Sequence, residues 1–164
     1  AYTGHGTIAS STITDNTADA DANGSGDAGG VRIESSTRLE LKNSIVVGNF
    51  DLSAGTVAPD CSGTFESLGY NFIGSLGVHT AACVVEGDTT GNVIGADPSL
   101  APLADNGGPT QTHALLTVPA QSVAIDAVPQ AMCVDGDGSP LTEDQRGVAR
   151  PQGDDCDVGA FELE

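Results

Sequence analysis

The stretch STITDN at residues 11–16 recurs as SIVVGN at residues 44–49, with a serine, apolar residues and a final asparagine at matching positions. Two further runs, YNFIG at residues 70–74 and GNVIG at residues 91–95, have the same character. Each run is short, rich in β-formers and bounded by glycine or asparagine, which is typical of a strand. Recurrence at intervals of roughly 20 to 35 residues is typical of solenoids, in which each repeat stacks on the next.

The remaining residues of this half also indicate strands rather than helices. Residues 31–34 and 39–41 alternate between apolar and polar side chains. The chain contains 22 glycines and 8 prolines, and no long window keeps the apolar stripe of a helix. We therefore predict an all-β protein whose strands stack as a parallel β-solenoid of a few coils. The alternative is an antiparallel β-sandwich, against which the unequal loops and the lack of hairpin dipeptides count.

Asn16 and Asn49 end the first two runs at equivalent positions. An asparagine at a turn tolerates a left-handed backbone and can hydrogen-bond to the asparagine of the next coil. We therefore predict that Asn16 and Asn49 form a ladder between adjacent coils.

Residues 17–30, TADADANGSGDAGG, contain no apolar side chain larger than alanine, and we predict an acidic surface loop. The loop includes a sequon for N-glycosylation, Asn23-Gly24-Ser25, to which we assign no role from the sequence alone. Four aspartates form an acidic cluster in and beside it: Asp15, Asp19, Asp21 and Asp27.

From about residue 97 prolines and glycines break up the pattern. We predict that residues 1–96 form the coils and residues 97–164 form an irregular cap of the same domain, covering the last exposed strand edges. The chain opens at Ala1 directly in solenoid-like sequence, without a signal peptide, so we expect a piece of a longer protein. An upstream segment or a second copy, stacked end to end, would then cover the first coil.

The four cysteines, Cys61, Cys83, Cys133 and Cys156, contain no C-x-x-C pair and match no zinc motif. Their even number indicates disulfides formed in an oxidising compartment. Three pairings are possible, and we favour the nearest-neighbour pairing of Cys61 with Cys83 and Cys133 with Cys156. Each loop closure is worth about 3 kcal/mol by the chain-entropy estimate.

The C-terminal half carries many short motifs in order. They are PDCSG (59–63), SLGYNFIG (67–74), ADP (96–98), LADNGGPT (103–110), THAL (112–115), AIDA (124–127), DQRG (144–147), RP (150–151) and CDVGAFE (156–162). Together they resemble the choice-of-anchor Q domain of bacterial surface proteins, over roughly residues 43–164, and residues 7–49 are similar to the coils that precede that domain. One departure is Gln121-Ser122-Val123, where family members carry Gly-Ser-Pro.

The resemblance implies architecture and location more than chemistry. It implies a right-handed parallel β-helix, similar in fold to pectate lyases, that ends in an irregular, disulfide-stapled cap. Such domains lie near the C-terminus of secreted proteins, just before a variable anchoring signal. The implied location is therefore extracellular, at the bacterial cell surface.

The charge excludes several classes of partner. The chain has 23 acidic and 5 basic residues, a net charge of −18. Binding to nucleic acid requires Lys and Arg to replace counterions on the phosphates, so we expect no nucleic-acid partner. No apolar run approaches the roughly 20 residues that span a bilayer, so we expect no direct membrane insertion.

Calcium is the cofactor that the sequence favours. Asp135 and Asp137 alternate with glycines, and Glu143 and Asp144 follow, so oxygen ligands gather on a flexible loop. The spacing is not that of an EF-hand. The alternative is a solvated acidic surface without a metal ion.

The main enzymatic alternative is a polysaccharide lyase or hydrolase, because many parallel β-helices bind polysaccharides along one face. A lyase needs a basic residue to take a proton, and Arg146 and Arg150 lie beside acidic residues. We expect both arginines to pair with local carboxylates and hold the cap instead. His5, His79 and His113 have no partner spacing, so we nominate no catalytic residue.

The sequence therefore predicts a non-enzymatic structural or adhesive module. Its expected partners are further copies of itself, stacked end to end into fibres, or cell-surface glycans. A carbohydrate-binding module is the alternative beside the lyase or hydrolase.

Overall fold

The computed structural model describes residues 4–53, 58–77 and 82–164. These residues form an all-β protein without an α-helix, as predicted, and one 3-10 turn spans Gln130–Met132. The strands are β1 (Gly4–Ala9), β2 (Thr12–Ile13), β3 (Thr17–Ala18), β4 (Val31–Arg32), β5 (Thr37–Lys42), β6 (Ile45–Val46), β7 (Phe50–Asp51), β8 (Cys61–Leu68), β9 (Phe72–Ile73), β10 (Cys83–Asp88) and β11 (Val93–Ile94).

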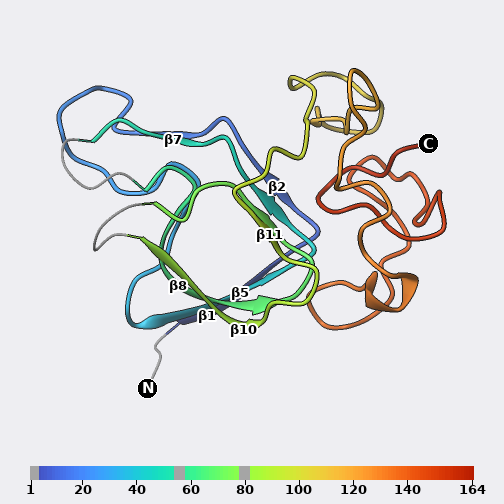
Figure 1. The fold of residues 1–164 in the computed structure, drawn as a ribbon, viewed down its shortest axis with the longest axis horizontal. Coiled ribbons are helices and arrows are strands. Elements are labelled where there is room, and N and C mark those ends of the chain that lie inside the picture. Colours follow the sequence, from blue (N-terminus) through green and yellow to red (C-terminus); the bar gives the residue numbers. More distant parts are fainter. Residues whose placement is uncertain (1–3, 54–57, 78–81) are drawn as a thin grey trace.

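The strands come from four successive passes of the chain that run in the same direction (Figure 1). One sheet, sheet A, has the order β1-β5-β8-β10, and β4 also pairs with β8. A second sheet, sheet B, has the order β11-β9-β6-β2, and β3 pairs with β7. Every pairing between these strands is parallel, which excludes the antiparallel sandwich.

The recurring sequence runs are the repeating unit of sheet B. Thr12 pairs with Ile45 and Phe72 pairs with Val93, so each run lies beside its counterpart. The separation between equivalent polar residues falls along the chain, from 33 between Asn16 and Asn49 to 21 between Asn71 and Asn92. The long first repeat contains the acidic loop of residues 17–30, most of whose tip is exposed.

Two polar ladders hold neighbouring passes in register. Asn16 donates through its Nδ2 atom to Asn49 Oδ1 at 3.0 Å, which is the contact expected from the sequence. The buried Asp60 continues this ladder, because its Oδ1 accepts the Asn49 backbone N–H at 2.9 Å. At the turn before sheet B, the Asn71 backbone N–H donates to Asn92 Oδ1 at 2.9 Å. Asn49 Oδ1 also accepts the Asn16 N–H at 3.2 Å, so each of these side-chain oxygens satisfies a backbone donor of the adjacent pass.

The space between sheets A and B is filled by one of the two apolar cores. Phe65 from sheet A and Val46 and Ile73 from sheet B lie in it. The Cys61–Cys83 disulfide joins β8 to its neighbour β10, with a Cα–Cα distance of 5.5 Å. This core is small, so the covalent link between the last two passes adds restraint where few large side chains are available.

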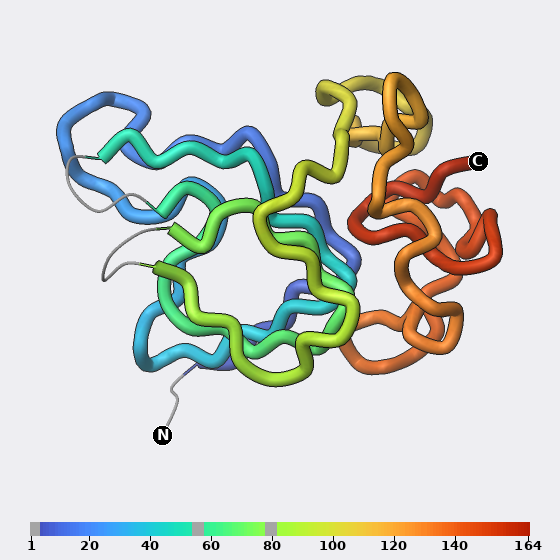
Figure 2. Tube along the Cα trace, in the orientation of Figure 1, coloured from blue at the N-terminus to red at the C-terminus, as the bar shows by residue number. Residues whose placement is uncertain are grey.

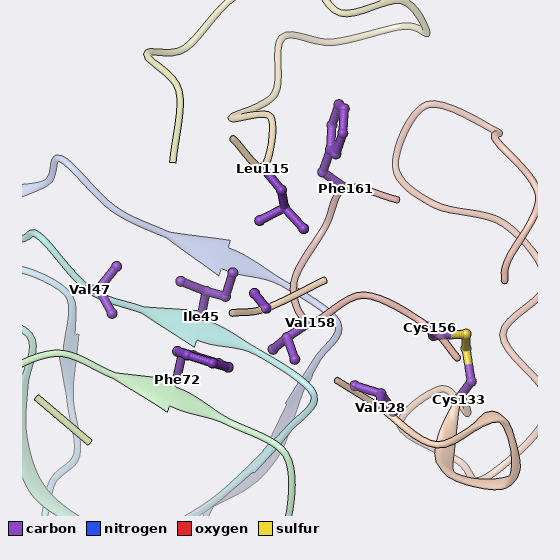
Figure 3. Close-up of a cluster of buried hydrophobic side chains, with 10 residues drawn as sticks. Ile45, Val47, Phe72, Leu115, Val128, Cys133, Cys156, Val158 and Phe161 are labelled. Atoms are coloured by element: carbon purple, nitrogen blue, oxygen red, sulfur yellow. A yellow bond between two sulfur atoms is a disulfide. The ribbon is translucent and has the colours of Figure 1, made fainter. Parts of the chain in front are cut away.

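The cap, residues 97–164, packs against the outer side of sheet B and not over the end of the stack (Figure 2). Figure 3 shows Ile45 and Phe72 of sheet B facing Leu115, Val128 and Val158 of the cap. The prediction that the cap covers the last strand edges is therefore wrong for the described residues. The physical reason is that the outer face of sheet B is apolar and gains more from burial than a single strand edge does.

The seam between cap and coils also carries hydrogen bonds. The Gly159 N–H donates to Asn43 O at 2.9 Å, and the Ala160 N–H donates to Thr12 Oγ1 at 3.1 Å. Asn43 donates through Nδ2 to Met132 O at 2.8 Å. The cap is thus fixed to the first two passes by both its middle and its C-terminal part.

The second disulfide, Cys133–Cys156, lies within the cap with a Cα–Cα distance of 6.0 Å. Both bonds follow the nearest-neighbour pairing favoured from the sequence. Two disulfides indicate an oxidising, extracellular environment. Among residues 4–53, 58–77 and 82–164 we find no helix of the length and apolarity that a membrane span requires.

Candidate functional site

The cap is organised around a buried carboxylate, Asp144. Its Oδ1 accepts the backbone N–H groups of Arg146 at 2.7 Å and Val148 at 3.1 Å. Its Oδ2 accepts Arg146 Nε at 2.9 Å and the Glu162 N–H at 2.9 Å. The Asp144 side chain is 0% exposed and that of Arg146 is 5% exposed. Arg146 also lies over the Phe161 ring, 3.7 Å from its centroid, so the pair joins two separate cap segments.

Arg150 occupies a second buried position in the cap. Its Nη1 donates to Asp157 O at 3.0 Å and its Nη2 donates to Gly159 O at 2.7 Å. Its Nε lies 3.5 Å from Glu162 Oε2, and both side chains are 1% exposed. Arg146 and Arg150 therefore pair with local carboxylates as expected, and neither guanidinium is accessible to take a proton from a polymer.

The buried carboxyl groups of the cap differ in the direction of their pKa shifts. Burial alone would raise the pKa of Asp144, but hydrogen bonds from the Glu162 N–H, Arg146 and the Val148 N–H outweigh it and lower that pKa. At Asp157 and Glu162 burial is the largest influence, and it raises both pKa values despite the hydrogen bonds to each carboxylate.

We expect these pKa shifts to give the free energy of unfolding opposite dependences on pH. Because the pKa of Asp144 is lowered, the unfolded chain binds more protons as the pH falls through the ordinary carboxyl range near 4, and stability is lost on acidification. Because the pKa values of Asp157 and Glu162 are raised, the folded chain binds more protons just above that range, and their contribution is lost as the pH rises through it. Urea midpoints measured across the acidic pH range test both dependences. Glu162→Gln should weaken the fall of the midpoint with rising pH above the ordinary carboxyl range. An unchanged fall would contradict the role given to Glu162.

The residues predicted to bind calcium serve other contacts or point to solvent. Asp135 Oδ1 accepts the N–H groups of Asp137 and Ser139, both at 2.9 Å, and so closes its own loop. Asp144 is enclosed by protein donors, whereas Asp137 and Glu143 are exposed. Within the described part of the chain there is no group of three or more His, Cys, Asp or Glu side chains suited to a metal ion. Calcium binding at this loop stays a prediction.

A polar arrangement on the outer face of sheet A was not anticipated from the sequence. Glu40 and Glu66 are neighbours in the register of β5 and β8. Arg38 Nη2 lies 3.1 Å from Glu40 Oε1 and 2.6 Å from Glu66 Oε2, and His5 Nε2 lies 3.4 Å from Glu40. The arginine therefore relieves the repulsion between stacked carboxylates. The sequence shows the period-two spacing of Arg38 and Glu40, but it does not show that Glu66 lies beside them on the neighbouring strand.

A groove runs along the seam between cap and coils, and we call it the seam groove. It consists of three adjoining hollows of about 500, 500 and 510 Å³. Thr14 and His113 line both the first and the third hollow, and Thr12 and Gln145 line both the second and the third. Neighbouring hollows therefore share part of their lining along the seam.

The lining of the seam groove suits a neutral, hydrogen-bonding ligand. His113 Nδ1 lies 2.8 Å from Ala101 O, and because a carbonyl only accepts, this nitrogen carries the proton. When the imidazole is neutral, Nε2 is then the hydrogen-bond acceptor of the ring. Thr14 adds a hydroxyl group, while Asp15 and Asp97 line one end and disfavour anions. His113 is half-buried and hydrogen-bonded, and His79 lies outside the described residues.

The last pass of the chain has an open apolar end. Ile13, Val46, Ile73 and Ile94 are register neighbours in β2, β6, β9 and β11. Val46 and Ile73 are each 1% exposed, whereas Ile94 is 49% exposed. The Val93 and Gly95 N–H groups donate to Asn71 O at 2.8 Å and Ile73 O at 2.9 Å, so the Ile94 N–H points to the other side, where no strand lies among the described residues. The Ile94 position is a strand edge with one exposed apolar side chain.

Comparisons of the chain with protein-family models, with curated proteins and with solved structures give no match. The function is therefore inferred from the sequence motifs and from the geometry of the seam groove and the open end.

Proposed function

We propose that the chain is a right-handed parallel β-helix module of a bacterial cell-surface protein, with a structural or adhesive role and no catalytic one. Each of the four passes is one coil, and the polar ladders and the Cys61–Cys83 bond hold the coils in register. The motifs that resemble the choice-of-anchor Q domain support the cell-surface location, and the two disulfides support an extracellular one.

The open end at Ile94 is the observation that carries the structural role. Ile13, Val46, Ile73 and Ile94 form one column of register neighbours across the stack. Val46 and Ile73 in this column are buried because a coil lies on each side of them. Ile94 has a coil on one side only, so among the described residues nothing covers the other side of its side chain or pairs with its N–H group. A strand edge of this kind pairs readily with another chain.

The occupant that fits this end is the first coil of a second copy. Ile13 lies in the same column at the opposite end of the stack, and β2 pairs on one side only among the described residues. A second copy placed with its Ile13 over Ile94 therefore continues the column with the same side-chain type. Such a head-to-tail contact does not close on itself and builds a fibre.

We expect the purified protein to form fibres in a concentration series viewed by electron microscopy, with an axial repeat of a few coils. Burial of the exposed part of Ile94 contributes about 1 kcal/mol, and an arginine there removes this and buries a charge. Ile94→Arg should therefore raise the concentration of half-assembly at least about tenfold. Because the net charge is −18, salt should promote assembly of the wild type.

The matched control is Val123→Arg in the cap, where the valine is 59% exposed and lies outside the stack. This variant should assemble like the wild type. Isolated short rods at every concentration and salt level, for the wild type as well as both variants, would contradict end-to-end stacking.

The seam groove favours one second candidate, a carbohydrate-binding role. Its hydroxyl, amide and imidazole groups can form hydrogen bonds with the hydroxyl groups of a neutral polysaccharide. The aspartates that line one end disfavour an anionic polymer. Titration calorimetry with neutral oligosaccharides tests it, with His113→Ala as the variant that should weaken binding. Equal binding by the wild type and His113→Ala, or no binding by either, counts against a carbohydrate site in the groove.

A further inference from the structure

We propose that Asn23 is the attachment site of an N-linked glycan. Asn23-Gly24-Ser25 is the sole Asn-x-Ser/Thr sequence in the chain, and all three residues are exposed. They lie in the middle of the acidic loop of residues 17–30, and this loop projects on the side of the coils away from the cap (Figure 1). A glycan on this loop therefore leaves the cap side of the molecule uncovered.

The loop presents this sequence in a fixed turn. Asp19, which is buried, accepts the Asn23 N–H through Oδ1 at 2.8 Å and the Gly24 N–H through Oδ2 at 2.9 Å. The Ala22 N–H donates to Asp19 O at 2.9 Å. Gly24 adopts a φ of 81°, which glycine accepts without strain. The carboxylate of Asp19 thus holds the backbone while the Asn23 side chain stays in solvent.

Two contacts orient the Asn23 amide. Its Oδ1 accepts the Ser25 N–H at 2.9 Å, and its Nδ2 donates to Asp21 Oδ2 at 2.7 Å. The second Nδ2 hydrogen has no partner within the residues that the structure describes. The Asp21 carboxylate draws on one Nδ2 hydrogen and so favours electron density on the nitrogen. Asp21 is therefore a positioning residue for the acceptor amide.

The reaction is the transfer of a sugar from a diphosphate-activated donor by a transferase of the host. The Asn23 Nδ2–C1 bond forms as the C1–O bond to the diphosphate breaks, and the diphosphate leaves with the electron pair. The proton lost from Nδ2 passes to a carboxylate base. This chemistry takes place outside the cytoplasm, and the disulfides Cys61–Cys83 and Cys133–Cys156 indicate such an environment.

The test uses the purified, oxidised chain, a lipid-diphosphate-linked oligosaccharide and two oligosaccharyltransferases, one bacterial and one eukaryotic. Intact mass and peptide mapping should find one glycan, on Asn23. Asn23→Gln and Ser25→Ala should each abolish the mass increase. Asp21→Ala should slow the transfer at least about tenfold, mainly in kcat, and Asp21→Glu should restore part of the rate.

The matched control for Asp21→Ala is Asp27→Ala, which removes a carboxylate of the same loop that pairs with Arg32 at 2.6 Å. It should leave the rate unchanged. The proposal is overturned if neither transferase modifies the folded chain while both modify a control peptide carrying the same sequon. Modification only after reduction and unfolding overturns the claim that the folded loop presents Asn23.

Discussion

Asp144→Ala is expected to lower the free energy of unfolding by about 3–5 kcal/mol, the cost of breaking a buried ion pair by removing one partner. The substitution leaves the Arg146 guanidinium, 5% exposed, without its carboxylate, and leaves the N–H groups of Val148 and Glu162 without an acceptor. Equilibrium unfolding in urea, followed by circular dichroism, measures the change.

Glu143→Ala is the matched control, because it removes the neighbouring carboxylate from an exposed position. Its effect should stay within about 0.5 kcal/mol. The pair of variants also separates two roles of this segment. If added calcium stabilised the wild type by several kcal/mol and Glu143→Ala removed that effect, the acidic loop would be a metal site after all. An Asp144→Ala variant as stable as the wild type would contradict its place at the centre of the cap.

Phe72→Ala is expected to cost about 3–5 kcal/mol, the range for truncating a buried phenylalanine. Phe72 is 1% exposed and lies between sheet B and the cap, facing Val158 in Figure 3. The cavity left behind would loosen the cap from the coils, because both contribute side chains to this core. Thermal and urea unfolding of the oxidised protein measure the loss.

Phe50→Ala removes the same side chain from β7, where it is 51% exposed. Its cost should be about 1 kcal/mol, because about half of the residue already contacts water. Equal losses for Phe72→Ala and Phe50→Ala would mean that the core between sheet B and the cap does not hold the two parts together.

The class of fold was predictable because the strand signal is local. Short runs that end in asparagine or glycine repeat through the first half, and glycine and proline exclude long helices. The contact of Asn16 with Asn49 followed from their equivalent positions in two runs. The ladder of Asn71 and Asn92 was harder to see, because these residues precede their strands where Asn16 and Asn49 follow theirs.

The position of the cap was not predicted, although the sequence contains a signal for it. Ile45, Val46 and Val47 are consecutive apolar residues, and all three are buried. A strand with one face in water alternates, whereas a continuous apolar run indicates that both faces are covered. The run therefore requires a second layer on the outer side of sheet B, and residues 97–164 supply it.

The site residues depended on contacts that sequence spacing does not reveal. Asp144 resembled a calcium ligand because the sequence shows its oxygen atoms but not the N–H groups that fold against them. Asp60 lies in the PDCSG motif, but nothing in that motif indicates that it extends the Asn16–Asn49 ladder. Arg146 and Arg150 were assigned correctly to the cap, since an arginine beside carboxylates is more often paired than free.

The most direct test of end-to-end stacking is amide hydrogen exchange at Ile94, measured at low and at high protein concentration. In the isolated chain the Ile94 N–H points away from β9 and should exchange rapidly, while the Ile73 N–H lies within the stack. Stacking of a second copy would pair the Ile94 N–H, so its exchange should slow at least about tenfold as concentration rises. Exchange at Ile94 that stays fast at every concentration, with fibres absent, would contradict the assembly role.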